Sequence, residues 1–110
     1  DIPSEGSGEI RQRVMQTRLI QLNRFKEHTG IHCNAQMERV DLERFCAIDD
    51  ACRQLLKHAM DRLGLSARAY DRILKVARTI ADLEQAPTIQ TGHISEAIQL
   101  RSLDRETWAG

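Results

Sequence analysis

The sequence predicts an all-α protein, a small bundle of about five helices. Apolar residues recur at intervals of three and four residues in several windows, as on one face of an α-helix. No window alternates convincingly between apolar and polar residues, and aromatic residues make up 4% of the chain. A chain of 110 residues is expected to form one domain with one modest core.

The charges balance, with 16 basic and 16 acidic residues. This balance argues against a free-standing nucleic-acid-binding protein, which usually carries a strong basic excess. The distribution is uneven, because residues 9–28 carry a net charge of +3 (five basic, two acidic) and residues 38–50 a net charge of −3 (two basic, five acidic). We interpret both segments as solvated helix faces that attract each other. A basic first helix lying along a nucleic-acid backbone is the alternative.

The three cysteines, Cys33, Cys46 and Cys52, are odd in number and lack paired spacing. They indicate reduced thiols and a cytoplasmic protein rather than a disulfide framework. The sequence shows no signal peptide and no long apolar run, so we expect no membrane partner.

Residues 1–8 contain two serines and two glycines and predict a flexible linker, as at the edge of a piece of a longer protein. Ser7 is placed to cap a first helix over residues 8–28, with Gly30 just past its end. The apolar residues of this helix form one stripe of Met15, Leu19, Leu22 and Phe25, and a second stripe begins at Ile10 and Val14. Two stripes indicate contacts with two different partners along the helix.

Residues 30–36 predict a loop. Asp41 is then a suitable cap for a short helix, with Val40 and Phe45 placed as a hydrophobic staple. Asp49 is expected to cap a third helix over residues 50–63, which Gly64 ends. The predicted inward face of that helix is Cys52, Leu55, Leu56, Ala59 and Leu63. Two residues separate it from the next cap, so the two helices should form a tight corner or hairpin.

The stretch over residues 64–83 predicts the best-defined helix. Ser66 can cap it, and Leu65 and Tyr70 are placed for a hydrophobic staple. The predicted inward face is Tyr70, Ile73, Leu74, Ala77, Ile80 and Ala81. Arg68 and Arg72 lie one turn apart, away from the middle of that face. Spacing alone leaves open whether these arginines are solvated or functional.

Pro87 is expected to end this helical region, helped by Glu84 and Gln85. Thr91 is the expected cap of a fifth helix, whose inward face is Ile94, Ala97, Ile98 and Arg101. From Leu103 the chain is expected to be irregular, with Trp108 as its large anchor. The expected organisation is therefore a helical domain over residues 9–105 and a tail over residues 106–110.

No residue is predicted to be catalytic, and no metal site is predicted. The spacing of the cysteines and histidines matches no structural zinc site. Cys33 and His58 could form a nucleophilic Cys–His pair, but nothing in the sequence marks the thiol as activated. The chain has no glycine-rich phosphate loop, so it is not expected to bind and hydrolyse a nucleotide alone. It could contribute one arginine, Arg68, to a phosphate site, because an arginine in the first turn of a helix suits that contact.

Residues 64–83, Gly-Leu-Ser-Ala-Arg-Ala-Tyr-Asp-Arg-Ile-Leu-Lys-Val-Ala-Arg-Thr-Ile-Ala-Asp-Leu, resemble a C-terminal segment of magnesium-chelatase-like AAA+ ATPases of the ComM type. A twenty-residue run of this kind is a specific signal. The resemblance extends to Ser7–Val14, Asn34–Met37, Phe45-Cys46, Ile89, His93-Ile94, Glu96-Ala97 and Arg101–Arg105, and covers roughly residues 4–105.

The resemblance implies that this region is the helical lid of an AAA+ ATPase, following an ATPase core that the chain lacks. Ser66-Ala67-Arg68 matches the setting of the family's sensor-2 arginine, so Arg68 would contact the γ-phosphate of ATP. That ATP, with Mg²⁺, would be bound by the parent protein and not by this fragment alone. The contact could be in the same subunit or a neighbouring one. The first helix could be the extra helix that repositions the lid in related modules.

The resemblance further implies a parent that forms hexameric rings and acts on DNA as a helicase for branch migration in natural transformation. The implied partners are its own core, neighbouring subunits and DNA. One alternative is the lid of a magnesium-chelatase ATPase subunit. Another is a non-enzymatic helical adaptor that binds protein or DNA through residues 9–28. Arg72 and Arg78 are assigned no role, since either could be an interface or surface residue.

Overall fold

A computed structural model describes residues 7–103, and within them every regular element is a helix. The elements are α1 (Ser7–Arg24), the 3₁₀ turn η1 (Asn34–Gln36), α2 (Arg39–Phe45), α3 (Asp50–Leu63), α4 (Ala67–Leu83) and α5 (Thr91–Leu103). The predicted all-α bundle is confirmed. Most of the predicted linker, the predicted tail and Trp108 lie outside the described residues, whereas Ser7 and Gly8 begin α1.

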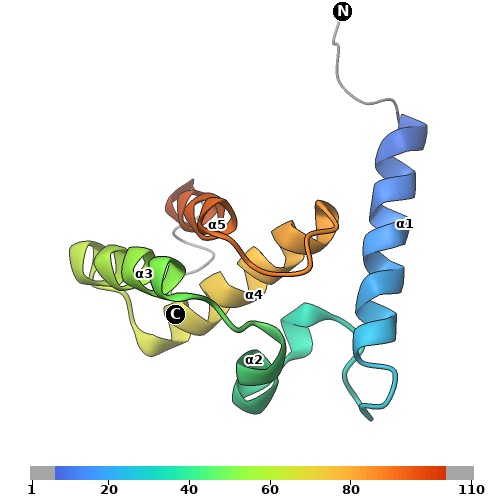
Figure 1. Cartoon of the computed structure of the whole chain (residues 1–110), viewed down its shortest axis with the longest axis horizontal. Helices are drawn as coiled ribbons and strands as arrows, with labels where there is room; N and C mark the ends of the chain where they lie inside the picture. Colours follow the sequence, from blue (N-terminus) through green and yellow to red (C-terminus); the bar gives the residue numbers. More distant parts are fainter. Residues whose placement is uncertain (1–6, 104–110) are drawn as a thin grey trace, which may run out of the picture.

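Helix α4 is the central element, and α1, α2, η1 and α5 all pack against it (Figure 1). Its predicted inward face is buried at Ile73, Leu74, Ala77 and Ala81. Helix α5 contributes Ile94 and Ala97 to the core, and α3 contributes Cys52 and Leu56. Helix α3 packs mainly on α5, so α3 and α4 meet at a corner and are not a side-by-side hairpin.

Three predicted helix boundaries are confirmed around this corner. The Asp49 carboxylate accepts a hydrogen bond from the Cys52 amide at 2.9 Å and caps α3. Gly64 ends α3 in the left-handed conformation, with φ 62°, which costs a glycine little. Ser66 Oγ accepts from the Ala69 amide at 3.2 Å and caps α4.

Two boundaries near Pro87 differ from the prediction. Helix α4 ends at Leu83, because Gln85 adopts φ 57° and the Gln85 and Ala86 amides turn back to the carbonyls of Asp82 and Ala81 at 2.9 and 2.8 Å. Thr91 is the first residue of α5. The observed capping contact comes from His93, whose Nδ1 accepts from the Gln90 amide at 2.9 Å.

Helix α2 begins before the predicted cap. Glu38 occupies the cap position, and its amide donates to Asp41 Oδ2 at 2.9 Å, so Asp41 lies in the first turn of the helix. Val40 is 66% exposed. The predicted staple between Val40 and Phe45 is therefore wrong, since a staple needs both residues packed together.

The prediction for α1 is wrong at its C-terminal end. The helix ends at Arg24 instead of residue 28, and Phe25 is buried against the edge of Phe45, with ring centroids 5.3 Å apart. The first of the two apolar stripes, which was expected to contact a partner, is exposed at Met15, Leu19 and Leu22. The buried residues of α1 are polar, Thr17 and Gln21. Thr17 Oγ1 donates to the Arg13 carbonyl at 2.8 Å, and Gln21 Oε1 accepts from the Asn34 amide at 2.9 Å. Within the described residues, no helix is both long enough and apolar enough to cross a membrane.

The core assignment can be tested by comparing two leucines of α3. Leu56 is fully buried, whereas Leu63 is 45% exposed although its spacing predicts an inward position. We expect Leu56→Ala to lower the free energy of unfolding by about 2–5 kcal/mol, because it leaves a cavity. We expect Leu63→Ala to change it by about 0.5 kcal/mol or less. Urea unfolding measures both values, and equal losses would contradict the packing described here.

Candidate functional site

The predicted site residue, Arg68, lies in the first turn of α4. Gly64 turns the chain out of α3, and Ser66 fixes the start of the next helix. These two local signals place Arg68 one residue inside the helix, with an exposed side chain. Within residues 7–103 the Arg68 side chain has no hydrogen bond or ion pair.

The position of Arg68 is electrostatically unfavourable for the isolated helix. The helix dipole places partial positive charge at the first turn, where a cation costs about 0.3–1 kcal/mol at an exposed site. The first turn of α4 contains no acidic residue that could offset this. The same end of a helix attracts phosphate, and a guanidinium adds two donors in a fork. The arrangement is therefore suited to meeting an anion from outside the domain.

The other charged residues at this end of α4 differ from Arg68. Asp71 accepts from Arg39 of α2, with Arg39 Nη2 3.3 Å from Asp71 Oδ2. Arg72 is half-buried and has an interaction partner. The structure thus separates the two arginines that spacing left undecided, since the Arg68 side chain is exposed and the Arg72 side chain is half-buried.

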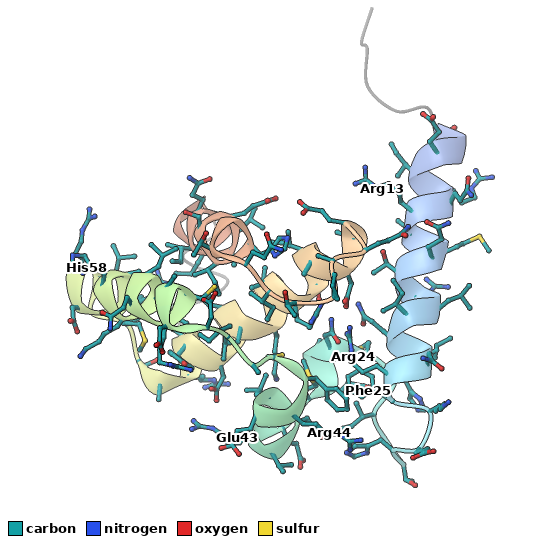
Figure 2. All side chains as sticks on the ribbon, viewed as in Figure 1. Arg13, Arg24, Phe25, Glu43, Arg44 and His58 are labelled. Atoms are coloured by element: carbon teal, nitrogen blue, oxygen red, sulfur yellow. The ribbon has the colours of Figure 1, made fainter. Side chains whose placement is uncertain are left out.

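A buried ionic network lies at the opposite end of α4, and it was not predicted from the sequence. Arg24 forms two parallel hydrogen bonds to Asp82, Nη1 to Oδ2 at 2.8 Å and Nη2 to Oδ1 at 2.7 Å. Asn34 donates from Nδ2 to the same Oδ2 at 2.9 Å and accepts from Arg24 Nη1 at 2.9 Å. The three side chains join the end of α1, the turn η1 and α4. Figure 2 shows Arg24 and Phe25 at the base of α1.

Arg78 belongs to this network and is neither a surface nor an interface residue of the domain. It is 5% exposed, and its Nε lies 3.2 Å from Asp82 Oδ1. Its Nη2 donates to the Ala86 carbonyl at 2.8 Å and its Nη1 to the Pro87 carbonyl at 3.3 Å. Arg78 therefore holds the segment after α4 against the helix. Burial lowers the pKa of the guanidinium, and the neighbouring Asp82 charge opposes that effect.

The pKa of Asp82 lies below its ordinary value. Burial raises it, but the hydrogen bonds from Arg24 and Asn34 and the charges of Arg24 and Arg78 outweigh the burial. Asp82 is consequently ionised between two arginines. The acidic charge that pairs with α1 is thus in α4, although residues 38–50 were expected to attract the basic first helix. The two segments do meet at His28, whose Nε2 lies 3.3 Å from Asp41 Oδ1.

The candidate nucleophilic pair, Cys33 and His58, is not brought together. Burial raises the pKa of the Cys46 thiol to about 11 and that of the Cys52 thiol also to about 11. Cys33 lines a groove beside α1 and α4. His58, labelled on α3 in Figure 2, lines a separate groove between α3 and α5. Among residues 7–103, no group of three or more His, Cys, Asp or Glu side chains could hold a metal ion.

Comparison with known proteins gives consistent matches. The family described as magnesium chelatase, subunit ChlI C-terminal, matches residues 4–101. The chain is 38% identical to YifB of Escherichia coli over 94% of this chain and 20% of YifB. It is 40% identical to the competence protein ComM of Haemophilus influenzae over 92% of this chain and 19% of ComM. YifB of Salmonella typhimurium is 37% identical over 92% of this chain and 19% of that protein. The chain thus spans about a fifth of the length of these relatives. No solved structure matches it.

The electrostatic cost of Arg68 can be measured in the chain itself. We expect Arg68→Gln to raise the free energy of unfolding by about 0.3–1 kcal/mol at low salt, because it removes a cation from the positive end of α4. Arg62, in the last turn of α3, is the matched control. Arg62→Gln should lower stability by a similar amount, because it removes a cation from the negative end of a helix. Thermal unfolding at low and high salt measures both, and changes of the same sign would contradict the assignment.

The Asp82 network predicts a pH-dependent loss of stability. The folded-state pKa of Asp82 is lowered, so its contribution is present above the unfolded-state pKa and is lost as the pH falls through the folded-state pKa. We expect Asp82→Asn to cost about 3–5 kcal/mol at pH 7, because it leaves two buried arginines without their carboxylate.

That difference should shrink as the pH falls from about 5 toward 2, where the wild-type carboxyl also takes up a proton. Urea unfolding at several pH values measures it. Asp50→Asn is the control, since the Asp50 side chain is 94% exposed in its pair with Arg53. A cost for Asp82→Asn that stays constant across this range would show that the charge of Asp82 is not what stabilises the fold.

Proposed function

The chain belongs to the magnesium chelatase subunit ChlI C-terminal domain family, and we propose that it is the lid of a ComM-type AAA+ ATPase. In this proposal Arg68 is the sensor-2 arginine. The lid contributes the arginine to ATP bound by the ATPase core of a longer protein, and the core supplies the Mg²⁺ site. The family match over residues 4–101 and the identity with ComM support this assignment.

The exposure of Arg68 at the start of α4 is the observation that carries the proposal. The side chain has no hydrogen-bonding or ion-pair partner within residues 7–103, and it lies where the helix dipole favours an anion. A γ-phosphate oxygen would satisfy both the guanidinium and the helix end. In this proposal the unfavourable position of the Arg68 charge in the isolated domain becomes favourable once the nucleotide is bound.

The proposed mechanical role follows from the way α4 is held. Its inward face is buried in the core and its far end is fixed to α1 through Asp82 and Arg24. A pull on Arg68 would therefore be carried along α4 to its far end rather than bend the helix. ATP binding would draw Arg68 toward the phosphate, and hydrolysis would release it.

For the longer protein we propose a hexameric ring that moves DNA during branch migration in natural transformation, in the cytoplasm. The name of one relative, competence protein ComM, supports this version. The family description favours a second candidate, in which the lid serves an ATPase subunit of a magnesium chelatase. Both candidates use Arg68 in the same way and differ in what the ring acts on.

The test is the ATPase rate of the longer protein carrying Arg68→Ala. Loss of one hydrogen-bonding cation from a phosphate should lower the ATPase kcat about 10- to 100-fold. Arg62→Ala, an exposed arginine of α3, is the control and should leave the rate unchanged. Circular dichroism of the isolated chain must show that both variants fold. Equal turnover by Arg68→Ala and wild type would exclude Arg68 as a nucleotide sensor.

A further inference from the structure

Helix α1 has its polar and apolar sides reversed relative to an ordinary surface helix. Thr17 and Gln21 are buried against the domain. Three apolar residues on the other side are exposed: Met15 at 57%, Leu19 at 61% and Leu22 at 44%. They follow the spacing i, i+4, i+7 and so form one continuous stripe. In Figure 1 α1 lies at the edge of the molecule.

The contacts on the polar side fix which face of α1 is turned outward. Gln21 Oε1 accepts from the Asn34 amide at 2.9 Å, and Arg24 pairs with buried Asp82. Rotating the apolar stripe inward would break both contacts and leave Asp82 without its main partner. The domain therefore holds the stripe in an outward position by buried polar bonds.

The charges beside the stripe describe its partner. Arg11 lies four residues before Met15, and Arg18 lies four residues before Leu22, so both border the apolar surface. Helix α1 as a whole carries four arginines and one glutamate, a net charge of +3. Two copies of α1 would repel each other. The complementary surface is apolar and bears carboxylates.

The length of the relatives indicates where that surface lies. The matched family is the C-terminal domain of its subunit, and the chain spans about a fifth of each relative. Most of a protein of this kind therefore lies before the domain in sequence.

We propose that the exposed stripe Met15–Leu19–Leu22, bordered by Arg11 and Arg18, is the surface through which this domain docks on the preceding ATPase core. This inference rests on the proposed function, since it assumes that core. Docking through α1 would connect the core to the Arg24–Asp82 pair, and through α4 to Arg68. The contact is independent of nucleotide, whereas the contact made by Arg68 requires it.

The test uses the chain and the separately produced core of its own longer protein, mixed without nucleotide. Isothermal titration calorimetry should show binding that Leu19→Asp weakens at least about tenfold, because a carboxylate would enter an apolar, acidic interface. Leu100→Asp is the matched control, since Leu100 is an exposed leucine of α5. Leu100→Asp and Arg68→Gln should bind like wild type. Hydrogen exchange should also show slower exchange of α1 amides in the longer protein than in the isolated chain.

Several results would overturn the proposal. The first is equal affinity of Leu19→Asp and wild type for the core, and the second is equal exchange of α1 amides in the longer protein and the isolated chain. The proposal would also fail if the chain associated with itself, or bound duplex DNA, in a way that Leu19→Asp abolishes. The ATPase test of Arg68 is separate. If Arg68→Ala leaves the ATPase rate unchanged but Leu19→Asp weakens binding to the core, only the sensor role of Arg68 is excluded. If Arg68→Ala slows the ATPase but Leu19→Asp binds like wild type, only the docking interface is excluded.

Discussion

The bidentate pair between Arg24 and Asp82 is the interaction on which the arrangement of the domain depends. It joins residues 58 positions apart in sequence and ties the end of α1 to the end of α4. Removing two charges from water is costly. That cost is offset here because Asn34 donates a further hydrogen bond to the Asp82 carboxylate and Arg78 places a second positive charge beside it. The geometry is consequently specific. An apolar contact could slide or rotate, whereas this pair allows one orientation of α1.

The network also relates the two ends of α4 to each other. Arg68 and Asp82 are 14 residues apart, which corresponds to about 21 Å along a helix axis. Between them the buried face of α4 runs through the core without a glycine or proline. A helix supported in this way transmits a displacement at one end to the other. The exposed arginine and the buried carboxylate are thus two ends of one stiff element.

Local signals in the sequence predicted the parts of the fold that depend on local physics. Asp49, Gly64 and Ser66 act on amides or dihedral angles within three residues, and their roles are confirmed. The apolar face of α4 was predicted because helical spacing is also local. The Asp82 network could not be predicted in this way, since its partners lie on three separate elements. The stripe on α1 was identified from its spacing, but spacing does not reveal what covers an apolar face. The position of Arg68 was predicted from local signals, whereas the role proposed for it comes from the family resemblance.

The burial of two of the three thiols has a practical consequence. Thiol-directed reagents react with the thiolate, and Cys46 and Cys52 are both enclosed and held in the neutral form. Cys33 is partly open and lines the groove between α1 and α4. A fluorescent or paramagnetic label would therefore attach at one natural position, without removal of any other cysteine. That position adjoins the seam between the two helices, so the label would report directly on any change in the angle at which they meet.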